Sequence, residues 1–262
     1  MSAREPEEIY EQTRREGRRR LSRPVLELVA TALVGGFDVA FGVAAFGITA
    51  ALTDERLGND AAHAVGAVVF GIGFVFVVVG RSELFTENFL IPIAGLDPRE
   101  RGSWLKLAEL WTVALVFNLV GGTLLALMLT SHRVMPAGTG DALVRLADHV
   151  GSYSPGTAIL SGIVAGALMT LMTWFVEGAA QSMGVRIVMA WIVGALIVLG
   201  TFNHAVVSQV ELVFGMRYGA DVSIGDYFAN LGLSIASNLV GGLLLVTFVR
   251  SVQAGGRGAG KR

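Results

Sequence analysis

Apolar stretches long enough to cross a bilayer recur along this chain, and this feature restricts its fold more than any other. A membrane helix needs about 20 mainly apolar residues, and only structures that pair their own backbone groups survive in hydrocarbon. Hydrophobic residues make up 53% of the chain and charged residues only 16%, whereas charge reaches about 25% in soluble domains. The sequence therefore predicts an integral membrane protein.

Charge divides the chain into three parts. Residues 1–24 are polar and highly charged, and we expect them on the cytoplasmic side, as a flank that sets topology or as a segment resting on anionic headgroups. Residues 25–249 form the membrane domain, and residues 250–262 are expected to be a disordered cytoplasmic tail. The predicted spans are Val25–Leu52, Ala61–Gly80, Ser103–Thr130, Gly156–Ala180, Val185–Gly215 and Tyr227–Val249, with aqueous loops at Thr53–Asp60 and Ser131–Pro155.

Basic residues set the orientation of the spans, because short cytoplasmic loops carry an excess of Lys and Arg. If the N-terminus is inside, the outer loops carry only Arg56, Arg133, Arg145 and Arg217, and the inner segments carry nearly all the others. The sequence therefore predicts six spans with both termini in the cytoplasm.

Two polar segments interrupt the apolar runs. Gly200–Glu211 places His204 near the middle of the fifth span, where an ionisable group is costly unless it faces water, protein or a substrate. Arg81–Asn88 follows the second span and leads into Phe89–Leu96, which is too short to cross alone. We interpret both segments as breaks in membrane helices; a turn at the headgroups and an ordinary aqueous loop are the simpler alternatives.

An internal repeat relates the two segments. Asn-Leu-Val-Gly-Gly occurs at 118–122 and at 238–242, and a shift by the same separation aligns the first polar segment with the second. The aligned pairs are Glu83 with Asn203, Leu84 with His204, and Asn88 with Ser208. Each half has three spans, so the second half must insert upside down. The predicted fold is an all-α membrane protein of six helices in an inverted 3+3 repeat, with helices 2 and 5 broken.

Facing helix breaks offer free backbone N–H groups and positive half-helix ends, which suit a small anion. His204 donates a hydrogen bond when neutral and a proton when charged, so a weak-acid anion could cross as the acid. Thr86 could orient the imidazole. The other candidates are Asn203, Leu84 and Phe85 at the site, Arg81, Glu83, Glu87, Asn88 and Ser208 in the breaks, Phe74 and Ile197 as constrictions, and Asn118, Gly121, Gly122, Asn238, Gly241 and Gly242 as close-packing positions.

Other chemistries lack the residues they need. The chain has no cysteine, and His63, His132 and His149 show no metal-ligand spacing, so we predict no metal site. No nucleotide-binding or nucleophile motif is present, which predicts neither enzyme activity nor a cofactor. The net charge of −1 argues against nucleic-acid binding.

The motifs resemble those of the formate/nitrite transporter family. Glu83–Asn88 resembles the family's ELFTGN motif, Thr201–Ala205 resembles its GFEHS motif, and both NLVGG copies resemble its NxxGG segments, in order from about Val25 to Val249. The resemblance implies an aquaporin-like protomer with its own pore, a homopentamer, and a place in a bacterial-type inner membrane. It also implies passage of formate, nitrite or similar small anions, with His204 as the central pore histidine and Thr86 as its partner.

The chain departs from the family pattern at several positions. Glu87 stands where the family usually has glycine, and Asn203 replaces the glutamate before the histidine. The lysine usual at the outer mouth aligns near Val150, and the asparagine usual in the fourth helix aligns with Gly166. Arg81 and Glu87 could form an ion pair across the first break, or lie on separate sides of it.

Three functions from different classes are compatible with the sequence. The first is a pore for small monovalent anions that move with a proton. The second is a channel for water or a neutral solute such as ammonia or hydrogen sulfide, because an uncharged imidazole suits that too. The third is a membrane scaffold that recruits partners through residues 1–24.

Overall fold

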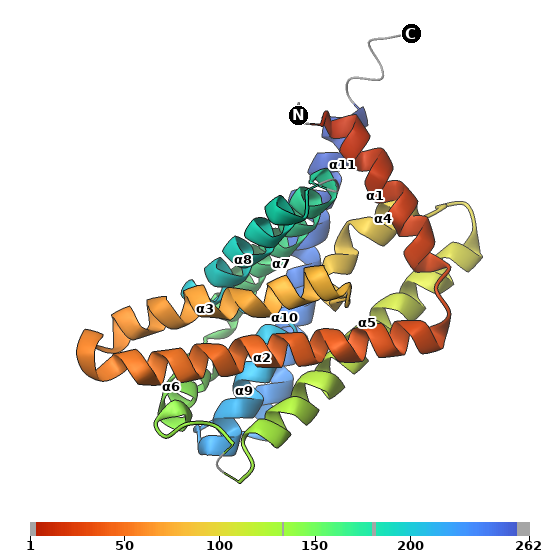
Figure 1. Ribbon diagram of the computed structural model, residues 1–262. Coiled ribbons are helices and arrows are strands. Elements are labelled where there is room, and N and C mark those ends of the chain that lie inside the picture. The colour runs from red at the N-terminus through yellow and green to blue at the C-terminus, as the bar shows by residue number, and fades with distance from the viewer. Residues whose placement is uncertain (1–3, 133, 180–181, 256–262) are drawn as a thin grey trace.

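The computed structural model describes residues 4–132, 134–179 and 182–255. These ranges contain helices and turns but no strand. The elements, labelled in Figure 1, are α1 (Pro6–Leu21), α2 (Val25–Leu57), α3 (Asn59–Gly80), η1 (Phe85–Phe89), α4 (Ile91–Gly95), α5 (Arg101–Leu129), α6 (Thr139–Gly151), α7 (Pro155–Gly178), α8 (Met183–Leu199), α9 (Val207–Tyr218), α10 (Ile224–Val240), η2 (Gly241–Phe248) and α11 (Val249–Gly255).

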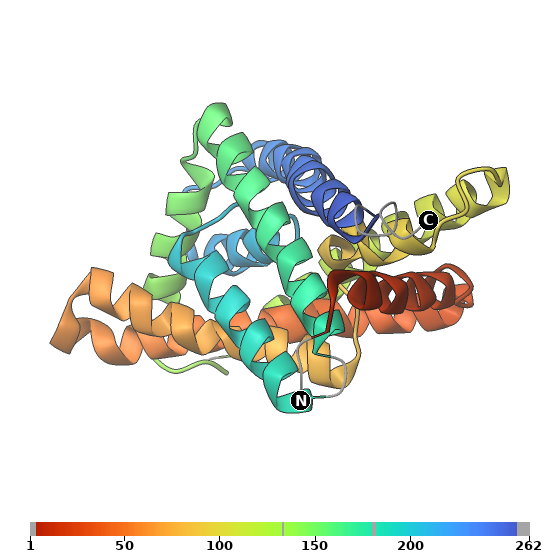
Figure 2. The same ribbon diagram turned by 90° about the horizontal axis from the view of Figure 1, so that it is seen from above.

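Five helical rods have the length and composition of membrane spans. They are α2, α3, α5, α7 and the continuous rod Ile224–Gly255, while α8 is apolar but only 17 residues long. The predicted fifth span, Val185–Gly215, is divided between α8 and α9. Helix α2 lies along α3 and α5, and α3 lies along α8, as Figures 1 and 2 show.

Three predicted loop or tail regions contain more helix than expected. The loop predicted at Ser131–Pro155 holds α6, whose Leu143 and Ala147 are buried against α9. The loop predicted at Thr53–Asp60 shrinks to a single turn, because α2 continues to Leu57 and Gly58 adopts a φ of 78° that glycine tolerates. Helix continues through α11 to Gly255, and residues 256–262 lie outside the described ranges.

The N-terminal segment is an ordered helix packed on the membrane domain. Helix α1 crosses α4 so closely that a Cβ on Gly17 would meet the backbone of Ile91 and Gly95. Ser251 Oγ in α11 donates a hydrogen bond of 3.2 Å to the hydroxyl of Tyr10, and Figure 1 shows α1 and α11 at the same end of the molecule. The charged N-terminal segment therefore belongs to the folded body.

Small residues let the helices of each half approach at their backbones. A Cβ on Gly36 in α2 would meet the backbone of Asn118, and a Cβ on Gly166 in α7 would meet the backbone of Asn238. Gly121 and Gly241 pack in the same way against α2 and α7. The repeated NLVGG segments therefore occupy equivalent packing positions in the two halves.

Replacing Gly166 by alanine should lower the thermal unfolding temperature in detergent. The added Cβ would lie 2.6 Å from the Cα of Asn238, and backbone cannot yield as a side chain can. Overpacking of this kind costs about 1–3 kcal/mol. Gly232→Ala is the matched control, because a Cβ there meets nothing within 4 Å and alanine favours helix. Equal unfolding temperatures for the two variants would contradict the close approach.

Candidate functional site

Helical structure is interrupted at two positions that the internal repeat aligns. Helix α3 ends at Gly80 and Arg81 adopts a φ of 57°, while α8 ends at Leu199 and Thr201 adopts a φ of 47°. Left-handed backbone is uncommon for any residue except glycine, and especially for a β-branched one. Thr201 is the residue that the repeat aligns with Arg81, so both halves leave the helix by the same conformation.

The asparagine of the first NLVGG copy holds the first break. Asn118 Nδ2 donates to the carbonyls of Ala32, at 2.7 Å, and Glu83, at 2.8 Å. Its Oδ1 accepts from the backbone N–H of Phe85 at 2.8 Å. One buried amide thus joins α2, the break and α5, and pairs backbone groups that no helix pairs.

Asn238 plays the equivalent part in the second half. Its Nδ2 donates to the carbonyls of Gly162 and Asn203, both at 2.9 Å, and its Oδ1 accepts from the N–H of Ala205 at 2.9 Å. The separation of the NLVGG copies therefore relates the bonded residues of the breaks as well as the two asparagines.

A second pair of polar side chains secures the turn of each break. Asn88 Nδ2 donates to the carbonyl of Leu84 at 3.2 Å, and Ser208 Oγ accepts from the N–H of His204 at 3.0 Å. Each bond spans four residues and links positions that the repeat aligns. Both side chains therefore satisfy the backbone at the centre of the break.

The two breaks meet at His204 and Thr86. His204 is fully buried, and its Nδ1 accepts from the N–H groups of Val206, at 3.2 Å, and Val207, at 3.0 Å. An imidazole nitrogen that accepts carries no proton, so the ring proton is on Nε2. Nε2 lies 2.8 Å from Oγ1 of Thr86, which accepts it. The pair is therefore neutral, and the hydroxyl hydrogen of Thr86 remains available to another acceptor.

Apolar side chains surround this pair. The ring of Phe74 lies 6.3 Å from the ring of His204, centroid to centroid. Leu84, Phe85 and Ile197 are also buried. The predicted constriction residues thus lie in the interior, and Phe74 among them is next to the ring of His204.

Asn203 contributes its backbone more than its side chain. Its N–H donates to Oγ of Ser161 at 2.9 Å, and its carbonyl accepts from Asn238. The side-chain Oδ1 is buried without a hydrogen-bond partner in the described part of the chain. The structure therefore places Asn203 in the wall of the second break.

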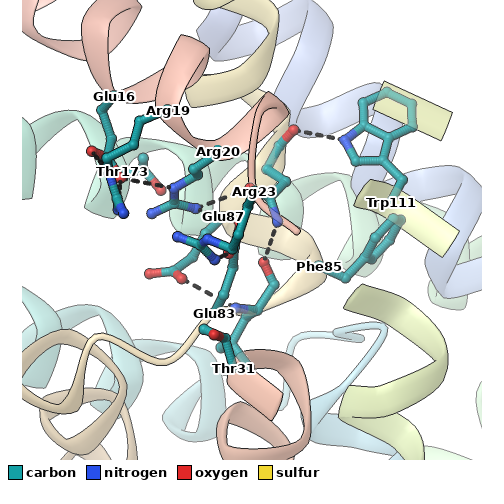
Figure 3. A network of polar contacts seen from close by, with 12 residues as sticks. Glu16, Arg19, Arg20, Arg23, Thr31, Glu83, Phe85, Glu87, Trp111 and Thr173 are labelled. Carbon is teal, nitrogen blue, oxygen red and sulfur yellow. Dashed lines mark hydrogen bonds and ion pairs between the residues drawn. The ribbon is translucent and has the colours of Figure 1, made fainter. Parts of the chain in front are cut away.

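A charged cavity of about 230 Å³ lies at the end of α3 where α1 packs, and Figure 3 shows this region. We call it the α1 cavity. Its charged lining residues are Glu16, Arg19, Arg20, Arg23, Arg81, Glu83, Glu87, Glu177 and Arg186.

Two arginines of the N-terminal segment pair with the first break. Glu83 is only 2% exposed, and it accepts from Nη1 of Arg20 at 3.1 Å and from Nη1 of Arg23. Arg20 Nη1 also donates to Oδ1 of Asn88 at 2.9 Å. Figure 3 shows Arg20 from α1, Arg23 from the turn that follows α1, and Glu83 close together. The cluster fastens α1 to the segment that carries Thr86.

The charges of this cluster shift the pKa values of groups on α1. Burial acts to lower the pKa of Arg20, but the negative charges of Glu83 and Glu87 outweigh it and the pKa is raised. Burial acts to raise the pKa of Glu16, but the hydrogen bond from Arg19 and the charge of Arg20 lower it. Both groups are therefore held in their charged forms.

Arg81 and Glu87 do not pair with each other in the described ranges. Arg81 is exposed, whereas Glu87 is buried and its Oε2 accepts from the N–H of Leu84 at 3.2 Å. Of the two arrangements that the sequence allowed, the structure has the residues apart.

A second cavity, of about 310 Å³, lies at the opposite end of α3 near α6. His63, Arg145, His149 and Thr201 are among its lining residues. Arg145 pairs with Asp54 across 2.8 Å. His149, next to the position where the family resemblance expects a lysine, therefore lines this second cavity.

Sequence reasoning missed the part played by Arg20 and Arg23. The available signal was a mismatch of charge, because Glu83 sits in an apolar region with no basic residue nearby except Arg81. A buried carboxylate needs a partner, and the basic run before Pro24 was a candidate for it.

Comparison with known proteins identifies the family. A model of the family described as "Formate/nitrite transporter" matches residues 7–252. "Inner membrane protein YfdC" of Escherichia coli (strain K12) is 26% identical over 248 residues, which cover 94% of this chain and 77% of that protein.

Two solved structures share the fold. "Pentameric formate channel with formate bound" has a TM-score of 0.73 at 19% identity, covering 87% of this chain and 96% of that chain. "FNT family ion channel" has a TM-score of 0.78 at 16% identity, covering 92% and 97%. With the family match across almost the whole chain and helices of membrane-span composition, this chain belongs to the formate/nitrite transporter family of membrane proteins.

Proposed function

We propose that this chain forms a pore for small monovalent anions of weak acids, such as formate or nitrite, which cross together with a proton. The observation that carries the proposal is the buried pair of His204 Nε2 and Thr86 Oγ1, 2.8 Å apart, where the two breaks meet. The formate bound in the pentameric channel of similar fold supports formate as a substrate here.

The pair offers hydrogen bonds without a fixed positive charge. Nε2–H of His204 and the hydroxyl of Thr86 can each donate to an oxygen of a small anion. The apolar walls penalise a bare charge by several kcal/mol, in keeping with the cost of burying an unpaired ion. An anion that binds a proton avoids most of this penalty, so flux should rise as pH falls and the acid form becomes more abundant.

The proposed architecture follows from the two matching breaks. α3 with η1 and α4 forms the second, broken helix, and α8 with α9 forms the fifth, which gives six spans in an inverted 3+3, aquaporin-like arrangement. The distribution of Lys and Arg favours cytoplasmic termini in a bacterial-type inner membrane. The pentamer named for the solved formate channel supports a homopentamer with one pore per protomer.

A channel for water or a small neutral solute is the second candidate. It is favoured by one observation, the neutral state of the His204–Thr86 pair beside the ring of Phe74, with no cationic side chain of the described residues bonded to it. Such a site accepts ammonia or hydrogen sulfide without a proton.

Proteoliposomes containing the purified chain test the proposal directly. Vesicles with a trapped pH dye are mixed with formate, nitrite or an osmolyte at several pH values, and protein-free vesicles are the control. We expect formate and nitrite to acidify the lumen faster than in control vesicles, and increasingly so at lower pH. Fast osmotic swelling that ignores pH, without anion-dependent acidification, would favour the neutral channel instead.

A further inference from the structure

Passage as an acid needs a group that exchanges the proton, and the geometry of His204 argues against that residue. Its ring carries only the Nε2 proton, and giving this away would leave an imidazolate. A second proton on Nδ1 would point at the N–H groups of Val206 and Val207, which now donate to that atom. Another titratable side chain has to carry the proton.

Glu87 is placed for this exchange. It directly follows Thr86 in η1, so the same short helix presents the hydroxyl to His204 and the carboxylate to the α1 cavity. Glu87 is 7% exposed and lines the cavity, and its Oε2 accepts one hydrogen bond from the N–H of Leu84. Figure 3 shows it close to the arginines from α1.

The carboxylate of Glu87 differs from that of Glu83 in having no ion pair. Arg20 and Arg23 both bond to Glu83, and in the described ranges no Lys, Arg or His nitrogen lies within 4.0 Å of a Glu87 oxygen. A carboxylate that forms ion pairs with two guanidinium groups does not accept a proton readily. A carboxylate that lines a water-accessible cavity without an ion pair can accept one. Among the described residues, Glu87 is therefore a carboxylate without an ion pair that directly follows Thr86 in η1.

We propose that Glu87 is the proton-exchanging residue at the α1 side of the pore. It gives a proton to an anion that enters the pore from the α1 cavity, and it takes a proton from an acid that reaches this cavity from the other side. This rests on the proposed anion–proton function. When formate enters the pore from the α1 cavity, the O–H bond of Glu87 breaks and its electron pair stays on the carboxylate. The proton forms an O–H bond with a lone pair of formate. Glu87 then regains a proton from water in the α1 cavity, and the reverse sequence serves acids that arrive.

Charged groups from several elements line the cavity in which this exchange takes place. The negative charges of Glu87 and Glu177 both help to raise the pKa of Arg20. The groups that share the cavity are Glu16, Arg19 and Arg20 from α1, Arg23 from the turn between α1 and α2, Arg81 and Glu83 from the first break, Glu177 from α7 and Arg186 from α8. Their arginines attract the anion, so donor and acceptor are brought to the same cavity.

Glu87→Gln tests the proposal, because glutamine keeps an oxygen to accept from Leu84 but cannot exchange a proton. Formate-driven acidification is measured in vesicles with matched protein content. At pH 7, where the free acid is scarce, we expect a fall of about tenfold or more, in line with the weight of a positioned proton donor. At pH 5 water supplies the acid, and we expect a rate within about twofold of the unchanged chain.

The controls separate proton exchange from loss of charge or fold. Glu11→Gln removes a carboxylate from the surface of α1, outside this cavity, and should leave both rates unchanged. Glu87→Asp keeps a titratable group and should retain more flux at pH 7 than the glutamine variant. Equal rates for Glu87→Gln and the unchanged chain at pH 7 would overturn the proposal, and so would an equal loss at both pH values. No formate flux from the unchanged chain would instead defeat the proposed function.

Discussion

Formate flux through a His204→Asn variant should fall about 10- to 100-fold. The Oδ1 of asparagine can accept from the N–H groups of Val206 and Val207, as Nδ1 does now, so the second break keeps its support. Asparagine does not reach Thr86 with a donor, because Nε2–H is lost. One hydrogen bond to a charged group contributes about 1.5–3 kcal/mol, and each 1.4 kcal/mol is about tenfold in rate.

His204→Ala and two Thr86 variants complete the test. Alanine removes both ring nitrogens, so flux should fall at least as far and the unfolding temperature should drop as well. Thr86→Ser keeps a hydroxyl and should retain most of the flux, whereas Thr86→Val, which is similar in shape, should lose it. Stopped-flow acidification of vesicles measures the rates. A His204→Asn variant that transports formate within twofold of the unchanged chain would refute the role of Nε2.

The repeat explains why the two breaks could be located from sequence. NLVGG is short, but its separation also relates Arg81 to Thr201, which both have a positive φ. It relates Phe85 to Ala205 as well, and the N–H of each donates to the asparagine of its own NLVGG copy. Spacing along one chain is visible in the sequence. The hydrogen bonds that Asn118 and Asn238 make to the breaks were not predicted, because they depend on which helix faces the asparagine.

The helices outside the spans show where sequence reasoning fails. Helix α6 has 13 residues, too few to span a bilayer, so hydropathy alone does not distinguish it from a loop. Its burial against α9 is a tertiary effect. Helix α1 was expected on the cytoplasmic side as a flank, but its packing depends on Gly17 meeting α4 and on arginines meeting Glu83. The composition of such a segment gives its charge, but it does not show which part of the protein the segment packs against.

The departure at Glu87 illustrates a different limit. The sequence places it in the motif and allows either an ion pair with Arg81, which is close along the chain, or a position on the other side of the break. The left-handed turn at Arg81 instead leaves its side chain exposed, and Arg20 comes from a distant segment. Proximity in sequence therefore placed both residues in one loop but could not decide between the two arrangements, and the arginines of the N-terminal segment pair with Glu83.

Replacing Glu83 by glutamine should destabilise the protein by about 3–5 kcal/mol and release α1 from the membrane domain. The change leaves Arg20 and Arg23, whose side chains are 13% and 7% exposed, without their shared carboxylate. Glu16 still pairs with Arg20 and Glu27 with Arg23, but neither replaces the buried carboxylate that offset the desolvation of both arginines. Thermal unfolding in detergent measures the first effect, and the rate of tryptic cleavage within α1 measures the second.

Two further variants isolate the buried cluster. Glu11 pairs with Arg14, Arg15 and Arg18 on the surface, where its side chain is 45% exposed, so Glu11→Gln should cost less than about 1 kcal/mol. Arg23→Leu in the Glu83→Gln background should restore part of the stability, because it removes a charge that glutamine cannot neutralise. If Glu83→Gln unfolds at the same temperature as Glu11→Gln, the ion pairs do not fasten α1. The contact of Gly17 with α4 would then be what holds it, and a Gly17→Ala variant should release α1 by itself.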